Sequence, residues 1–127
     1  MSDYPLAGLK VLDFSRVVAG PYATRMLSDL GAEVLKVEPP EGDVTRKLGK
    51  IDQGVSGYYL QLNIGKKNIC VDLRAEGARD LIHRLAEQAD IVVENFRPGV
   101  MDKFGIGWDD LSKINPRLVM LSISGYG

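Results

Sequence analysis

A strand, a helix and a second strand follow one another near the start of the chain, and this unit restricts the possible folds more than any other feature. Residues 10–14 (KVLDF) and 33–38 (EVLKVE) are short runs of strand-forming residues. Between them, Gly20 and Pro21 suit the first turn of a helix, and Gly31 suits its left-handed C-terminal cap. Strand–helix–strand units are almost always right-handed and join parallel strands. The opening therefore predicts a parallel sheet.

The rest of the chain continues this alternation. Further strands are predicted at 68–73, 91–93 and 118–123, which makes an open, mainly parallel α/β sheet with flanking helices. The polar residues 41–57 show no sustained period and form the longest predicted loop. Two short helices are expected after the turn at 94–99, the second from about Asp109 to the Asn115-Pro116 stop. The two longer helices have apolar residues every three or four positions: Ala19, Tyr22, Ala23, Met26, Leu27 and Leu30 in the first, and Ala78, Leu81, Ile82, Leu85 and Ala89 in a helix over 75–89.

Composition excludes several classes of protein. The 127 residues are 45% hydrophobic, which suits one domain with a real core. A net charge of -1 argues against nucleic acid or an anionic membrane surface as a partner. No apolar run approaches the roughly 20 residues that span a bilayer, and the start lacks a signal-peptide pattern, so a cytoplasmic protein is expected. The single cysteine, Cys70, lies in an apolar strand-like run and is predicted to be an inert core residue, with a reactive thiol as the alternative.

Chemistry is expected where the strands end, because ligands of open α/β sheets bind beyond the carboxyl ends of the strands. This rule selects residues 15–20, Pro39, Arg74, residues 95–97 and Ser124 onward. The helix that starts near Gly20 favours a negative group such as phosphate, although a Gly-Pro pair before a helix is more often plain turn chemistry. Neither a dinucleotide fingerprint nor a phosphate-binding P-loop is present.

Positive side chains near the predicted strand ends suit a phosphorylated cofactor. They are Lys66, Lys67, Arg74, Arg97 and Lys103, each of which is also compatible with a solvated surface charge. In the same region Phe96 is placed to stack on a planar ring while the Asn95 amide reads its edge, with a core aromatic as the alternative.

Other kinds of chemistry are disfavoured. His83 falls off the apolar face of its helix and is predicted to be exposed and without a role. One His and one Cys do not make a metal site. The serines at 15, 122 and 124 lack a plausible partner base, which argues against a serine hydrolase.

Three long strings are more specific than the composition: "LAGLKVLDFSRVVAGPYATRMLSDLGAEVLKVEPPEGD", "NIGKKNICVDLRAEGARDLI" and "ADIVVENFRPGVMDKFGIGWDDLSKINPRLVMLSISGYG". Together they resemble the N-terminal portion of family III CoA-transferases, a group that includes formyl-CoA transferase, carnitine CoA-transferases and α-methylacyl-CoA racemase. The most diagnostic segments are "DFSRVVAGP" and "ENFRPGVMDKFGIG". The match covers nearly the whole chain.

The resemblance implies that residues 1–127 are the N-terminal, coenzyme-A-binding part of a larger Rossmann-like domain, which this chain leaves incomplete. It implies a subunit whose two copies interlock as a dimer, so that this chain is expected to self-associate. The substrates implied are an acyl-CoA and a carboxylic acid, and no metal is implied. On matching positions, the resemblance assigns coenzyme A contacts to Val18, Ala19, Val71, Asp72, Leu73, Arg74, Asn95, Phe96, Arg97 and Lys103.

The sequence departs from the family at two of its binding positions. Some members have an arginine where this chain has Pro39, and some have a polar residue where it has Val18. The family's catalytic aspartate lies downstream of "SGYG", so no catalytic residue is assigned and the chain alone is expected to be inactive. Three functions stay open: a CoA-transferase, an acyl-CoA racemase of the same family, and a non-catalytic CoA-binding or assembly module.

Overall fold

Five parallel strands form the sheet that the strand–helix alternation predicts. A computed structural model of the chain describes residues 3–127. Its strands are β1 (Lys10–Asp13), β2 (Glu33–Glu38), β5 (Lys67–Cys70), β6 (Ile91–Glu94) and β7 (Val119–Ser122). They lie in the order β5-β2-β1-β6-β7, and every pairing is parallel. The strand order reverses direction between β1 and β6, which is where ligands of open α/β sheets bind.

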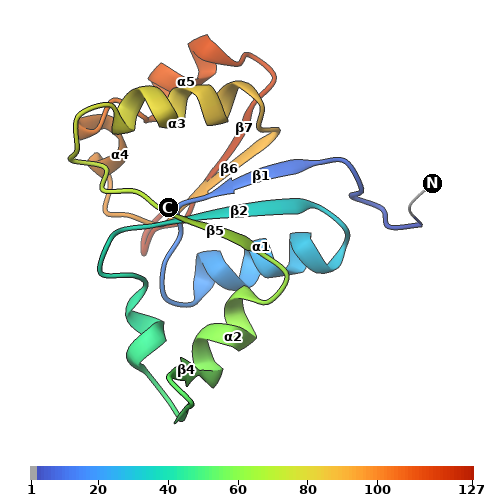
Figure 1. The fold of residues 1–127 in the computed structure, drawn as a ribbon. Helices are drawn as coiled ribbons and strands as arrows, with labels where there is room; N and C mark the ends of the chain where they lie inside the picture. The colour runs from blue at the N-terminus through green and yellow to red at the C-terminus, as the bar shows by residue number, and fades with distance from the viewer. Residues whose placement is uncertain (1–2) are drawn as a thin grey trace.

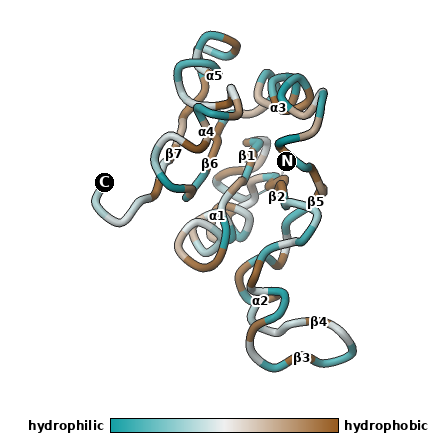
Figure 2. The backbone as a smooth tube through the Cα atoms, turned by 90° about the vertical axis from the view of Figure 1, so that its left-hand side faces the viewer, coloured by the Kyte–Doolittle hydropathy of each residue, from teal (hydrophilic) through white to brown (hydrophobic). Residues whose placement is uncertain are grey.

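Helices cover both faces of the sheet. Figure 1 shows α1 (Ala19–Asp29) and α2 (Gly57–Asn63) on one face, and α3 (Ala78–Glu87), α4 (Val100–Lys103) and α5 (Trp108–Ile114) on the other. The side view in Figure 2 separates the same three layers. The main core lies between the sheet and α3 to α5, and includes Leu12, Phe14, Ile82, Val92, Ile106 and Leu111. The predicted α/β architecture is thus confirmed.

Much of the apolar repeat of α1 lies on its exposed side, although Leu27 packs against the smaller core cluster around Val34. Tyr22, Met26 and Leu30 are 54%, 50% and 44% exposed, whereas the buried residues of the helix are Gly20, Pro21 and Thr24. The small residues allow α1 to approach the sheet closely, and the Thr24 hydroxyl donates to a buried Asp13 carboxylate, with 2.6 Å between the oxygens. The packing of α1 therefore combines close contact, hydrogen bonding and the partly buried Leu27, and the apolar stripe of Tyr22, Met26 and Leu30 stays uncovered in this chain.

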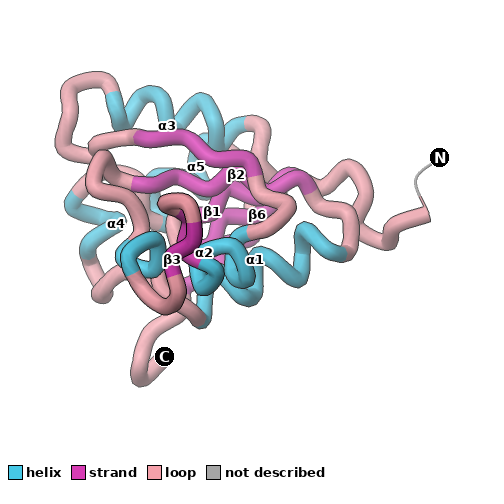
Figure 3. The backbone as a smooth tube through the Cα atoms, turned by 60° about the horizontal axis from the view of Figure 1, so that its bottom comes forward, coloured by secondary structure: helices cyan, strands magenta, loops and turns pink. Residues whose placement is uncertain are grey.

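The prediction of one long loop over residues 41–57 was wrong. A short 3-10 helix η1 (Val44–Lys47) and a hairpin of β3 (Ile51–Asp52) and β4 (Val55–Ser56) occupy this segment, and α2 follows at once. Figure 3 shows the hairpin beside α2. Two side chains cap these elements: Asp43 accepts from the Thr45 N–H, and Ser56 accepts from the Tyr59 N–H. Both are typical N-cap residues, so the sequence did contain this signal.

Several local predictions need correction. Cys70 is exposed, because it ends the edge strand β5 and has no neighbouring strand on one side. Helix α3 is shorter than 75–89; its Leu81 is 40% exposed, and Ala86 is fully buried instead. His83 is half-buried, and its Nε2 atom lies 2.7 Å from the Gly105 carbonyl oxygen, so it supports the turn after α4. No helix within residues 3–127 is long and apolar enough to cross a membrane.

Candidate functional site

A cleft of about 190 Å³ opens at the carboxyl ends of β1, β2, β5 and β6. Its position is the one predicted from the parallel sheet. The walls are largely apolar, with two arginines and two acidic residues at the edges, which is the usual composition of a small-molecule site. The lining residues are Phe14, Arg16, Val37, Pro39, Glu41, Val71, Asp72, Leu73, Arg74, Phe96 and Phe104.

Arg16 is a cleft residue that the sequence analysis did not select individually. Its guanidinium carbon lies 4.6 Å from the centre of the Phe96 ring, a cation–π geometry. The Arg16 N–H donates to Asn95 Oδ1 and the Arg16 carbonyl accepts from Asn95 Nδ2, both at 2.7 Å. One N–H and one oxygen lone pair of the Asn95 amide are therefore used by the Arg16 backbone. Through these bonds Asn95 joins the loops after β1 and β6.

Arg74 is held by its neighbour. Its Nε atom is 2.9 Å from Asp72 Oδ1 and its Nη2 atom is 3.3 Å from Oδ2. This pairing lowers the pKa of the exposed Asp72 carboxyl and raises that of Arg74. The ion pair with Asp72 holds the Arg74 guanidinium at the rim of the first cleft. An anionic ligand that bound there would replace the Asp72 carboxylate as the partner of Arg74.

The remaining predicted site residues are more scattered. Arg97 is exposed and lines a second cleft of about 260 Å³ beside β6 and β7, together with Met101, Trp108 and Ser122. Phe96 lines both clefts, so the two are adjacent. Three predicted site residues are exposed but line neither cleft: Val18 and Ala19 at the start of α1, and Lys103 at the end of α4.

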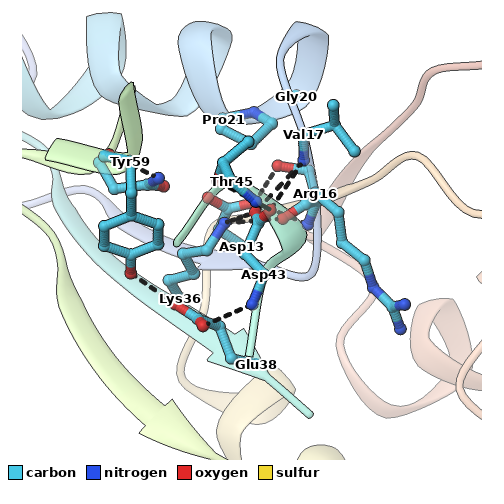
Figure 4. A network of polar contacts seen from close by, with 12 residues as sticks. Asp13, Arg16, Val17, Gly20, Pro21, Lys36, Glu38, Asp43, Thr45 and Tyr59 are labelled. Carbon is cyan, nitrogen blue, oxygen red and sulfur yellow. Dashed lines mark hydrogen bonds and ion pairs between the residues drawn. The ribbon is translucent and has the colours of Figure 1, made fainter. Parts of the chain in front are cut away.

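Figure 4 shows a buried polar network that involves the loops after β1 and β2. Lys36 Nζ is 3.1 Å from Asp43 Oδ2 and 2.9 Å from the Ser15 carbonyl oxygen, and both charged side chains are almost fully buried. Burial alone would raise the pKa of the Asp43 carboxyl, but the Thr45 N–H and the Lys36 ammonium outweigh it and lower the pKa. The network connects the loop after β1 with the loop after β2.

Lys66 belongs to a second buried ion pair, so its predicted role as a free positive charge for phosphate was wrong. Its ammonium lies 3.1 Å from Asp13 Oδ2 and also donates to the Pro21 carbonyl and to Asn63. Burial lowers the pKa of Lys66 to about 8, and the neighbouring Asp13 opposes that change. Lys67 is exposed and pairs with Glu33 at the amino end of β2, away from the cleft.

Glu38, at the end of β2, accepts five hydrogen bonds and is 4% exposed. Arg46 binds it through two nitrogens, at 2.7 and 2.8 Å, and also lies 3.9 Å from the centre of the Tyr59 ring. Burial would raise the pKa of Glu38, but bonds from Arg46, Tyr59 and the Asp43 N–H lower it to about 2. Burial and the hydrogen bond to the Glu38 carboxylate raise the pKa of the Tyr59 hydroxyl.

Acid is expected to destabilise this protein partly through Glu38. Because the pKa in the folded state lies below the ordinary 4.5, the ionised carboxylate stabilises the fold above pH 4.5, and this contribution disappears as the pH falls toward 2. The shift corresponds to roughly 3 kcal/mol. Urea unfolding between pH 6 and 3 should show a steeper loss for wild type than for Glu38→Gln. Glu87→Gln, on the surface of α3, controls for a lost carboxylate; parallel profiles for wild type and Glu38→Gln would contradict the prediction.

Comparisons with known proteins agree on one family. The sequence model described as CoA-transferase family III matches residues 6–127. The chain is 48% identical over 126 residues to the probable fatty acyl-CoA transferase Rv3272 of Mycobacterium tuberculosis, covering 97% of this chain and 32% of that protein. It is 46% identical over 125 residues to the human succinyl-CoA:glutarate CoA-transferase, covering 97% of this chain and 28% of the other.

Solved structures give the same result. A crystal structure of a CAIB/BAIF family protein from Brucella suis has a TM-score of 0.92 and 44% identity, covering 98% of this chain and 34% of that one. An orthorhombic crystal form of Rv3272 gives a TM-score of 0.91 at 47% identity, with 98% and 35% covered. The chain thus spans about a third of the length of these relatives.

Proposed function

This chain belongs to CoA-transferase family III, and from that premise we propose that it forms the coenzyme-A-binding part of an enzyme that moves coenzyme A between an acyl-CoA and a carboxylic acid. The observation that carries the proposal is the family match over residues 6–127, combined with a cleft at the strand ends. Relatives named for transfer between acyl-CoA and oxalate or glutarate support this reaction class. An acyl-CoA substrate follows from the same names.

The first cleft suits the nucleotide end of coenzyme A. Phe96 offers an aromatic ring, and Val71 and Leu73 offer apolar wall, against which a flat purine would pack. Arg16 and Arg74 stand at the same cleft and match the planar, bidentate recognition of phosphate oxygens. Pro39 lines this cleft at a position where the family resemblance implies an arginine in some members, and we assign that positive charge to Arg16.

A coenzyme A molecule that continued past Phe96 would reach Arg97 in the second cleft. On this assignment the ligand follows the strand ends from β5 to β7. Asp72 would contribute by orienting Arg74, and Asn95 by holding the Arg16 backbone. The proposed contact set is Val18, Ala19, Val71, Asp72, Leu73, Arg74, Asn95, Phe96, Arg97 and Lys103, with Arg16 added.

A homodimer is part of the proposal. The apolar stripe on α1 and the exposed Val119 and Leu121 of the edge strand β7 are surfaces of the kind that protein partners cover. Val119 is 60% exposed and Leu121 43%, which is unusual for apolar residues of a strand. These surfaces support self-association of the chain.

Calorimetric titration with coenzyme A tests the binding site. Arg97→Ala and Arg16→Ala are each expected to weaken binding roughly ten- to a hundredfold, because each removes a charged contact to a phosphate group. Lys47→Ala, on the exposed side of η1, is the charge-matched control and should bind like wild type. Equal losses in all three variants would reduce the site to general charge attraction.

The reaction itself is tested on the complete enzyme with an acyl-CoA and a free acid. Appearance of a new thioester is the expected result. Retention of the original thioester with exchange of the α-proton would instead identify a racemase. If no new thioester forms and no α-proton exchanges, both reactions are contradicted.

A further inference from the structure

Val17 has a backbone conformation that is unusual for its residue type. Its φ angle is +67°, in the left-handed region, and a β-branched side chain there is sterically strained. The neighbouring Val18 has an ordinary φ of -121°. Strained residues persist only where the surroundings over-determine them, and they gather at functional sites. Val17 lies between Arg16, which lines the first cleft, and Val18, a proposed contact.

The carboxylate of Asp43 holds this strained turn. The Val17 N–H points at both Asp43 oxygens, at 3.2 and 3.4 Å (Figure 4). The same carboxylate accepts from the Thr45 N–H at 3.0 Å and from the Thr45 hydroxyl at 2.9 Å. Lys36 neutralises it from the other side and also holds the Ser15 carbonyl oxygen. Within the turn at residues 15–17, the Asp43 carboxylate, on a different loop, thus holds Val17, while Asn95 holds the Arg16 backbone.

This carboxylate is well suited to such a task. The Asp43 side chain is 0% exposed and that of Lys36 is 1% exposed, so neither meets a ligand directly. A buried ion pair of this kind contributes little net stability compared with apolar residues of similar size. A buried carboxylate does specify geometry strongly, because each of its partners must remain in place to satisfy it.

We propose that Asp43 is a positioning residue of the coenzyme A site: by holding Val17 in the left-handed conformation it directs Arg16 into the cleft and places Val18 at the start of α1. The binding consequence rests on the proposed function, whereas the backbone consequence does not. Without the carboxylate, Val17 relaxes toward an ordinary conformation and the binding-competent turn becomes a minor state. Apparent affinity then falls in proportion to the population of that state.

Four variants of the full-length protein test this inference: Asp43→Asn alone, the same change combined with Val17→Gly or with Val18→Gly, and Thr45→Val. Asp43→Asn should weaken coenzyme A binding about tenfold, since the strained turn loses its support. Adding Val17→Gly to Asp43→Asn should restore affinity to within about threefold of wild type, because glycine adopts the left-handed region freely. Val18→Gly should restore nothing. The two valines are a matched pair, 42% and 41% exposed and adjacent in the chain.

Amide hydrogen exchange gives a readout that is independent of coenzyme A. The Val17 amide should exchange at least about tenfold faster in Asp43→Asn than in wild type. If Asp43→Asn does not fold, Thr45→Val carries the same test with a smaller effect, about two- to threefold, because it removes one donor to the same carboxylate. If the wild type binds no coenzyme A, the proposed function is refuted. The exchange rate of the Val17 amide then still decides whether Asp43 holds the turn.

The inference is overturned by any of three results. These are wild-type affinity in Asp43→Asn, equal rescue or no rescue by the two glycine variants, and unchanged exchange of the Val17 amide when Asp43 is replaced. A merely structural role of Asp43 predicts equal rescue or none, so selective rescue at Val17 separates the two explanations.

Discussion

Replacing Lys66 by methionine should lower the free energy of unfolding by about 3 to 5 kcal/mol, because it leaves the fully buried Asp13 carboxylate without its charged partner. At pH 7 Lys66 is still protonated, since its pKa is about 8. The remaining donors to Asp13, from Ser15 and Thr24, are neutral and do not compensate a buried charge. Urea unfolding at pH 7 measures the change.

The neighbouring lysine provides a matched control. Lys67 is 68% exposed and its partner Glu33 is 56% exposed, so Lys67→Met should change stability by less than about 0.5 kcal/mol. Adding Asp13→Asn to Lys66→Met should recover part of the loss, since the unpaired charge is then gone. Similar small effects of Lys66→Met and Lys67→Met would show that Asp13 does not depend on the pair.

Gly20→Ala should destabilise the protein by roughly 3 kcal/mol or more. A Cβ atom at this position would lie 2.1 Å from Ser15 Cβ and 2.5 Å from Ser15 Oγ. Relief requires the start of α1 or the loop after β1 to move, and both belong to the candidate site. Thermal and urea unfolding measure the loss, and coenzyme A titration should weaken in parallel if the variant folds.

Gly125→Ala is the control for this substitution. No atom lies within 4 Å of the added Cβ atom there, and its φ angle is not in the left-handed region. Its stability should therefore match wild type closely. Equal stability of the Gly20 and Gly125 variants would mean that α1 tolerates a larger separation from Ser15 than the packing indicates.

Much of the fold is readable from local patterns. The strand patterns at residues 10–14 and 33–38 flank a helix that begins at a Gly-Pro pair. This order correctly predicted that β1 and β2 are parallel strands. The strand-end rule then placed Arg74 and Phe96 at one edge, where a cleft lies. Both predictions succeed because residue periodicity and turn chemistry act over a few neighbouring residues.

Other predictions failed because they concern the burial of side chains, which depends on segments that are close in space but distant in the sequence. Cys70 was expected in the core from its apolar run, yet β5 lies at the sheet edge and leaves it exposed. The apolar repeat of α1 correctly indicated a helix, but with Gly20 packed closely against Ser15 its residues Tyr22, Met26 and Leu30 face outward. Helix α2 was missed because its polar lead-in, residues 41–57, has no helical period.

The sequence by itself determined the class of fold, the strand-end position of the cleft and, through the spelling of its motifs, the family. Only the tertiary structure decided which charges line the cleft. Lys66 reaches Asp13 across 53 residues, and Asn95 reaches Arg16 across 79. Lys66 is thereby buried as an internal counter-ion, while Arg16 stays at the cleft with its guanidinium over Phe96. The reason is physical: a side chain's pairing and burial depend on segments distant in the chain, whereas strand and helix patterns depend on near neighbours.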